Sequence, residues 1–261
     1  METPRVLVVL PTLGKRPEFF EKALQSCRDL SNRIPISIVV VVPGDDASTR
    51  RVCESRGAIV VDDPGTGMAD AINRALSIAT SEEFYIWLGD DDELVVDGVA
   101  RLVDALSQAP EAVVAYGHCD YVDNKGRKLV TSRGGTMARW MLAFGPNLIP
   151  HPGTVIRLSA LRAIGGFHPR LRYALDLDVF LRLRSLGHFI SLPVVASRFR
   201  WHEDSLTVAD RAASTREAIA VKNRHLPSLL RPFAWMWNYP VAGLSHLAAR
   251  RVSALARRLE P

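Results

Sequence analysis

Three consecutive aspartates, Asp90, Asp91 and Asp92, follow an apolar run at residues 84–88. Carboxylates held together at a strand end repel one another, and such groups commonly meet a cation. Oxygen ligands suit Mg²⁺ or Mn²⁺, and both ions also bind phosphate oxygens. The cluster by itself is compatible with two interpretations, a metal–phosphate site and a solvated acidic turn.

Segments of strand and helix character alternate along the first half of the chain. Apolar runs predict strands at residues 5–10, 36–42, 58–61 and 84–88, and helical spacing predicts helices at 17–30, 49–56 and 68–79. Strands that are apolar on both faces and separated by helices favour an α/β fold with a mainly parallel central sheet flanked by helices. Three of the four runs end in small or acidic residues, so we expect these ends to converge on one ligand-binding edge.

The second half of the chain has a more mixed pattern. It predicts strands at residues 113–118, 128–131 and 154–157, a hairpin turn at 123–126, and helices at 160–164 and 178–186. No repeat or low-complexity linker interrupts it. We therefore predict one catalytic domain at 1–226, with halves at about 1–110 and 111–226, and a separate tail at 227–261.

Composition places the chain among folded globular proteins. It has 261 residues, of which 48% are apolar and 23% charged. Cys27, Cys53 and Cys119 match neither a disulfide framework nor a zinc spacing, which favours a reducing compartment. The first apolar run is too short for a signal peptide, and no run is long enough to span a membrane. The expected location is cytoplasmic.

Four motifs occur in an order that resembles the inverting family 2 glycosyltransferases of the GT-A fold. They are a strand ending in Pro11-Thr12, a strand ending in Asp45-Asp46, a helix from Gly67 to Asn73, and an aromatic strand followed by Asp90 to Asp92. The likeness continues to about residue 207 through segments at 151–167, 173–182 and 200–205. The resemblance implies a metal-dependent, inverting transfer of a sugar from a nucleotide diphosphate sugar to a glycan or glycolipid acceptor.

The same resemblance implies which residues bind the donor and the metal. The donor-binding residues would be Pro11, Thr12, Asp45, Asp70, Asn73, Asp90 and His151. Mn²⁺ or Mg²⁺ would be held by Asp91, Asp92 and His202, because Gly89 replaces the first aspartate of the usual DxD motif. The sequence does not separate Asp45 from Asp46, and His151 is equally explained as a satisfied core histidine.

Asp176 is the residue that the resemblance implies as the catalytic base. An inverting transfer needs a base for the acceptor proton, and positive charge on the departing diphosphate. Leu175 stands where many relatives have a glutamate, so Asp176 is left alone there. Asp178 lies two residues further on, and in a helix it would point in a different direction. The alternative for Asp176 is an acid that interacts with a helix N-terminus.

Two other classes of function remain as alternatives. A sugar-nucleotide nucleotidyltransferase would also present acidic metal ligands, but it would carry a Gly-rich basic loop after the first strand, where residues 13–17 hold a single glycine. The other alternative is a non-catalytic protein that binds nucleotide sugars. Its only support is that Leu175 stands where many relatives have a glutamate. Release of nucleoside diphosphate from a nucleotide sugar distinguishes a transferase from both.

The tail at 227–261 carries five arginines and one acid, a net +4 within a total of +5. This placement does not favour a nucleic-acid binder. On a helical wheel one apolar sector contains Leu244, Ala248, Val252, Leu255 and Leu259, and aromatic residues precede it at 233, 235, 237 and 239. We expect the tail to contact an anionic membrane surface, which would suit a lipid-linked or cell-envelope acceptor. The alternative is a helix whose leucine face packs on the catalytic domain.

Overall fold

Four parallel strands form the N-terminal half of the sheet. In the computed structural model, which describes residues 5–201 and 210–259, these are β1 (Val6–Pro11), β2 (Ile36–Val42), β3 (Ile59–Asp62) and β4 (Phe84–Trp87). They lie in the order β3-β2-β1-β4. β1 is buried along its whole length, as expected for a strand covered on both faces.

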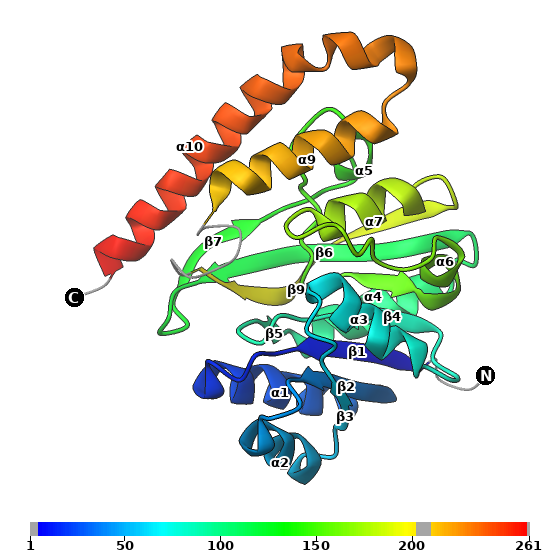
Figure 1. The fold of residues 1–261 in the computed structure, drawn as a ribbon, viewed down its shortest axis with the longest axis vertical. Coiled ribbons are helices and arrows are strands. Elements are labelled where there is room, and N and C mark those ends of the chain that lie inside the picture. Colours follow the sequence, from blue (N-terminus) through cyan, green and yellow to red (C-terminus); the bar gives the residue numbers. More distant parts are fainter. Residues whose placement is uncertain (1–4, 202–209, 260–261) are drawn as a thin grey trace.

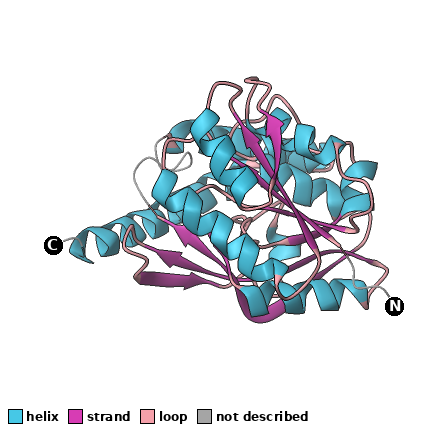
Figure 2. Ribbon diagram, turned by 90° about the horizontal axis from the view of Figure 1, so that it is seen from below, coloured by secondary structure: helices cyan, strands magenta, loops and turns pink. Residues whose placement is uncertain are grey.

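Helices cover both faces of these strands (Figures 1 and 2). Val6, Val8 and Leu10 of β1 face a core formed with α1 (Pro17–Ser31) and α4 (Val96–Ser107). The alternate residues Leu7 and Val9 face a second core, which contains α3 (Met68–Ser77). This division follows from the two-residue period of a strand.

The C-terminal half of the sheet is largely antiparallel. β6 (Ala112–Val122) pairs in parallel with β9 (His188–Arg200), but antiparallel with β7 (Lys128–Ser132) and β8 (Val155–Arg157). β8 joins the halves by pairing antiparallel with β4, and β5 (Glu93–Leu94) pairs with β9. The predicted α/β fold is thus confirmed, although its sheet is mixed, because β5, β7 and β8 run antiparallel to the strands they pair with.

One remaining helix, α2 (Ala47–Ser55), lies near β3 in the N-terminal half. The helices of the C-terminal half are α5 (Ala138–Met141), α6 (Leu158–Ala163), α7 (Leu175–Leu183), α9 (Arg211–His225), the 3₁₀ helix η1 (Ser228–Phe233) and α10 (Trp235–Leu259). α10 runs diagonally past the body of the protein in Figure 1. Among the described residues, no helix combines the length and hydropathy that crossing a membrane requires.

Candidate active site

The acidic loop that follows β4 is tied to the end of β1. The Thr12 hydroxyl donates a hydrogen bond to Asp90 Oδ2 at 2.7 Å, and the Thr12 amide donates to Val41 O of β2 at 2.9 Å. Burial raises the pKa of Asp90, although the hydrogen bond from Thr12 opposes this. The ends of β1, β2 and β4 therefore meet at one edge, as the sequence predicts.

Asp91 is the acidic-loop residue whose carboxylate faces a cation. Its Oδ2 lies 2.6 Å from Arg16 Nη1, at the start of α1. Within residues 5–201 and 210–259, no three His, Cys, Asp or Glu side chains form a group that could hold a metal ion. His202, the predicted third ligand, lies outside the described residues. A carboxylate such as that of Asp91 is the kind of oxygen ligand that divalent cations prefer.

The Asp92 side chain points into the protein and not toward solvent. It is buried, and its Oδ1 accepts a hydrogen bond from the Arg200 amide at 3.0 Å. Burial and the neighbouring Asp91 carboxylate raise its pKa well above the ordinary value. This arrangement gives Asp92 a structural role and lends no support to its predicted role as a metal ligand.

Arg200 fastens the acidic loop to the rest of the sheet. Its guanidinium, which is buried, donates to Asp91 O at 3.0 Å, to Glu93 Oε1 at 2.7 Å and to Asp123 O at 2.9 Å. It also lies 4.4 Å from the centre of the Phe19 ring. The sequence placed Arg200 in the late segment at 200–205 that resembles the family but gave it no individual role, and only the fold brings these partners together.

Asp45 and Asp46 differ in what their carboxylates do. Asp46 caps α2 by accepting from the Thr49 amide and the Ser48 hydroxyl, each at 3.0 Å, and the hydrogen bonds from Thr49 and Ser48 lower its pKa. Asp45 is exposed, and its carboxylate makes no hydrogen bond within the described part of the chain. Of the two, Asp45 is the residue whose side chain is open to solvent.

Asp70 and Asn73 lie on α3 but in different settings. Asp70 is half-buried in the first turn of the helix. Asn73 donates from Nδ2 to Phe167 O at 2.8 Å and accepts from the Phe167 amide at 2.9 Å. The amide nitrogen and oxygen of Asn73 thus both bond the backbone of Phe167, directly after the turn at Gly165-Gly166. The structure therefore favours a positioning role for Asn73 over the predicted donor contact.

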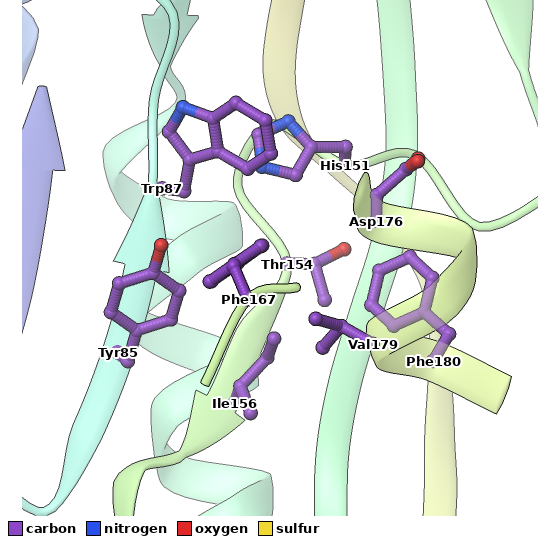
Figure 3. A pocket seen from close by; sticks show the side chains of 9 residues that line it. All are labelled: Tyr85, Trp87, His151, Thr154, Ile156, Phe167, Asp176, Val179 and Phe180. Carbon is purple, nitrogen blue, oxygen red and sulfur yellow. The ribbon is translucent and has the colours of Figure 1, made fainter. Parts of the chain in front are cut away.

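A small pocket lies between the sheet and α7 (Figure 3). Its lining is mostly aromatic and aliphatic, with Tyr85, Trp87, His151, Thr154, Ile156, Phe167, Asp176, Val179 and Phe180. The space open to a water centre is about 10 Å³, enough for roughly one water molecule. The pocket is thus no larger than one small group, and Asp176 lies at its wall.

Three polar atoms in this pocket have no hydrogen-bond partner among the described residues. They are Tyr85 Oη, Trp87 Nε1 and His151 Nε2. The Trp87 and His151 rings lie together, with centroids 3.7 Å apart (Figure 3). Burial lowers the pKa of His151 to about 3, so the imidazole is neutral at physiological pH. Buried polar groups almost always have partners, so these atoms indicate a place for a bound molecule.

Asp176 sits in the first turn of α7 and faces the pocket. Its carboxylate accepts from the Leu177 amide at 2.7 Å and from Asn147 Nδ2 at 2.9 Å. Burial raises its pKa from 3.8 to about 6, although these hydrogen bonds oppose the change. A carboxylate with a pKa near neutrality suits a general base.

Asp178 is directed elsewhere, as the geometry of a helix requires. It is buried and forms ion pairs with Arg182 at 2.7 Å and with His225 at 3.5 Å. Burial acts to raise its pKa, but His225 and Arg182 outweigh it and the pKa is lowered. Asp178 therefore holds α7 against α9 and stays ionised.

Two further residues support Asp176 that the sequence did not reveal. Asn147 comes from the segment after α5, and Glu217 comes from α9. The Glu217 carboxylate accepts hydrogen bonds from the amides of Arg172, Tyr173 and Ala174, at 3.1, 2.6 and 2.7 Å, and so fixes the turn that leads into α7. No local pattern in the sequence marks either contact.

Comparison with known proteins identifies the family. The model of glycosyl transferase family 2 matches residues 7–165. The crystal structure of S. aureus TarS 1–349 in complex with UDP-GlcNAc is similar, with a TM-score of 0.65, 14% identity, and coverage of 88% of this chain and 69% of that chain. The mannosyltransferase PcManGT from Pyrobaculum calidifontis, in complex with GDP-Man and Mn²⁺, has a TM-score of 0.68 and 18% identity over 100% of this chain and 77% of its own.

At these identities the two structures establish a shared fold, and the family model establishes descent. No curated protein sequence matches the chain significantly. The parallel strands β1 to β4, with the acidic loop at their carboxyl ends, lie within the matched residues. The chain belongs to glycosyl transferase family 2 and is a nucleotide-sugar glycosyltransferase of the GT-A fold.

Proposed function

We propose that this glycosyltransferase inverts the anomeric centre, with Asp176 as the base and a divalent metal on the leaving diphosphate. The observation that carries the proposal is the Asp176 carboxylate, which faces the pocket with a pKa raised by burial to about 6. Asp176 takes the proton of the acceptor hydroxyl while the hydroxyl oxygen attacks the anomeric carbon. The bond from that carbon to the diphosphate breaks on the opposite face, which inverts the configuration.

Asp91 is the residue proposed to hold Mn²⁺ or Mg²⁺, with Asp90 beside it and His202 as a further candidate. When bound, the metal supplies positive charge to the oxygens of the departing diphosphate. Arg16, which lies against Asp91, places a second cation at the same edge. The Mn²⁺ in PcManGT supports this choice by likeness of fold.

The donor is proposed to be a nucleotide diphosphate sugar that lies across the carboxyl ends of β1 and β2. Pro11 and Thr12 would form the floor of the base pocket, and Asp45 would contact the base or ribose. Asp70 and His151 would lie toward the sugar. Support comes from the exposure of Asp45 and from the unpartnered His151 Nε2, and by likeness from neighbours that bind UDP-GlcNAc and GDP-Man.

The test is donor hydrolysis by the purified protein with Mn²⁺. We expect slow release of nucleoside diphosphate from one of a panel of nucleotide sugars, loss of release in EDTA, and loss in Asp91→Asn. The anomeric configuration of the first-formed product, read by proton NMR, tests inversion. Release of pyrophosphate or nucleoside triphosphate instead would establish a nucleotidyltransferase, and tight binding without any release a non-catalytic binding protein.

We also propose that the tail at 227–261 rests on an anionic membrane, which suits a lipid-linked or cell-envelope acceptor. α10 packs on the body through Trp237 near its start and through polar side chains, since Asn238 donates to Asn223 and Ser253 accepts from Trp201 Nε1. Leu244, Leu247 and Leu255 are exposed, by 67%, 56% and 38%. The alternative in which a leucine face packs on the catalytic domain is therefore not supported.

A further inference from the structure

Charge is divided between the two halves of the chain more strongly than the tail alone suggests. Residues 1–123 contain 21 Asp and Glu and 11 Lys and Arg, a net −10. Residues 124–261 contain 7 acids and 22 Lys and Arg, a net +15. The tail supplies only +4 of this. From residue 124 to residue 175 there is no acidic side chain at all.

Large apolar side chains are exposed within this acid-free region, around α5. Met137 is 64% exposed and Trp140 is 66% exposed, and Phe144 follows them on the next turn. The Arg139 guanidinium lies 5.2 Å from the Trp140 ring centre. Arginine and tryptophan side by side at a surface are typical of the boundary between lipid headgroups and acyl chains.

The α5 segment is joined to the beginning of the tail. The Phe144 and Trp237 rings meet edge to face at 5.4 Å, and Lys222 Nζ donates to Gly145 O at 2.6 Å. In Figure 1, α5 lies beside the turn between α9 and α10. The large apolar side chains that are exposed in η1 and in or next to α5 are Met137, Trp140, Phe144, Leu229, Leu230 and Phe233, here named the α5–η1 surface.

The α5–η1 surface is also held in a fixed relation to the base. Asn147, which donates to Asp176, belongs to the segment that follows α5. Arg139, within α5, donates to Arg184 O just after α7. Whatever this surface contacts is therefore presented beside the residue that receives the acceptor proton.

We propose that the α5–η1 surface docks on an anionic lipid bilayer, so that the catalytic domain itself, and not the tail alone, contacts the membrane. The acceptor is then an amphiphile whose hydroxyl reaches Asp176 from the bilayer side. A bilayer fits better than a protein partner because exposed aromatic and aliphatic side chains of this surface lie in the stretch 124–175, which has several arginines and no acid. This inference rests on the proposed function, since it takes Asp176 as the base.

Tryptophan quenching by lipids with brominated acyl chains tests the contact directly. The vesicles contain equal parts phosphatidylcholine and phosphatidylglycerol, at low salt. Trp140 and Trp235 are exposed, whereas Trp87, Trp201 and Trp237 are half-buried. In Trp235→Phe the quenching reports mainly on Trp140, and in Trp140→Phe it reports mainly on Trp235. We expect quenching in both variants.

A pair of matched variants measures the contribution to binding. Met137→Ser/Trp140→Ser should weaken vesicle affinity about tenfold, because two apolar side chains no longer leave water. Ile59→Ser, which alters an exposed isoleucine on β3 far along the sheet, should leave it unchanged. Donor hydrolysis without vesicles should be the same in all three proteins.

The outcomes separate this inference from the proposed function. Quenching of Trp235 without quenching of Trp140 would overturn docking of the catalytic domain and leave the tail as the contact. Equal vesicle binding by the double variant and the wild type would overturn it as well. Failure of the wild type to hydrolyse any donor would contradict the proposed function, whatever the vesicles show.

Discussion

Replacing Asp176 with asparagine removes the carboxylate that faces the pocket and keeps the size of the side chain. If Asp176 is the base, turnover should fall about 10²–10⁴-fold, which corresponds to about 3–5 kcal/mol of transition-state stabilisation. Donor affinity should change little, because the base acts on the acceptor. Turnover is measured as nucleoside diphosphate release, and donor affinity by calorimetry with Mn²⁺.

The pH dependence of the wild-type rate is a second test of Asp176 as the base. A base is active when ionised, so the rate should rise with pH, reach half its plateau near the pKa of about 6, and fall to about a tenth of the plateau one pH unit lower. Asn147 stabilises the ionised form by its hydrogen bond. Asn147→Ala should therefore raise this pKa and move the acid limb to higher pH.

Stability should move in the opposite direction to activity. Because burial raises the folded-state pKa of Asp176 from 3.8 to about 6, the folded protein binds more protons than the unfolded chain in this interval. The free energy of unfolding therefore falls as pH rises from about 4 to 6, by at most about 3 kcal/mol before solvent screening is allowed for. At pH 8, Asp176→Asn should melt at a higher temperature than the wild type.

Asp178→Asn is the matched control. Asp178 is paired with Arg182 and His225, and removing one partner of a buried pair costs about 3 kcal/mol or more. This variant should melt earlier while keeping its turnover per folded molecule. The assignment of the base is refuted if Asp178→Asn loses turnover with an unchanged melting temperature, or if Asp176→Asn keeps both its turnover and the acid limb.

Three further substitutions address residues that position the site. Glu217→Gln weakens the hydrogen bonds from three amides before α7, so kcat should fall about tenfold and the acid limb should shift, with donor affinity retained. Asn73→Ala should lower the free energy of unfolding by about 2 kcal/mol in urea titrations, and an unchanged donor affinity would assign it to positioning. In Arg200→Lys the lysine cannot make all of the contacts of the guanidinium. The affinity for Mn²⁺ in the presence of nucleotide should therefore drop even at low temperature or in osmolyte, where the variant is folded.

The buried strands and the acidic loop were predictable because their signals are local. The uninterrupted apolar runs of β1 and β2 lie in the sequence itself, as do the aspartates at the end of β4. The partners of Asn73 and Asp176 were not predictable in this way. Asn73 meets Phe167, and Glu217 meets the turn at 172–174, through contacts that only the completed fold brings within reach.

The boundaries of two helices show where local rules were incomplete. α2 begins at Ala47 and not at 49, because the Asp46 side chain caps it. α7 spans Leu175–Leu183 and not 178–186, so both of its aspartates lie in the first turn, where acids are favoured by the helix dipole.

α10 shows the same limit for a surface. The helical wheel of the tail predicts one apolar sector that includes Leu244, Val252 and Leu255. In the structure Leu244 and Leu255 are exposed and Val252 is half-buried. The face that packs is defined by polar partners instead, since Ser253 accepts from both Trp201 and Arg211. Hydrophobic periodicity finds an apolar stripe, but it does not show whether that stripe meets protein or another phase.

The family match ends at Gly165, before Asp176 and before α9 and α10. Under the proposed function, the metal and the nucleotide would be bound in residues 1–123, which carry a net −10. The acceptor would be selected mainly in residues 124–261, where Asn147 donates to Asp176 and Glu217 fixes the turn before α7. A protein in which the α5–η1 surface is altered should thus lose use of a membrane-borne acceptor before it loses donor hydrolysis. If donor hydrolysis and acceptor use instead declined together in Met137→Ser/Trp140→Ser, this division of labour between the two halves would be wrong.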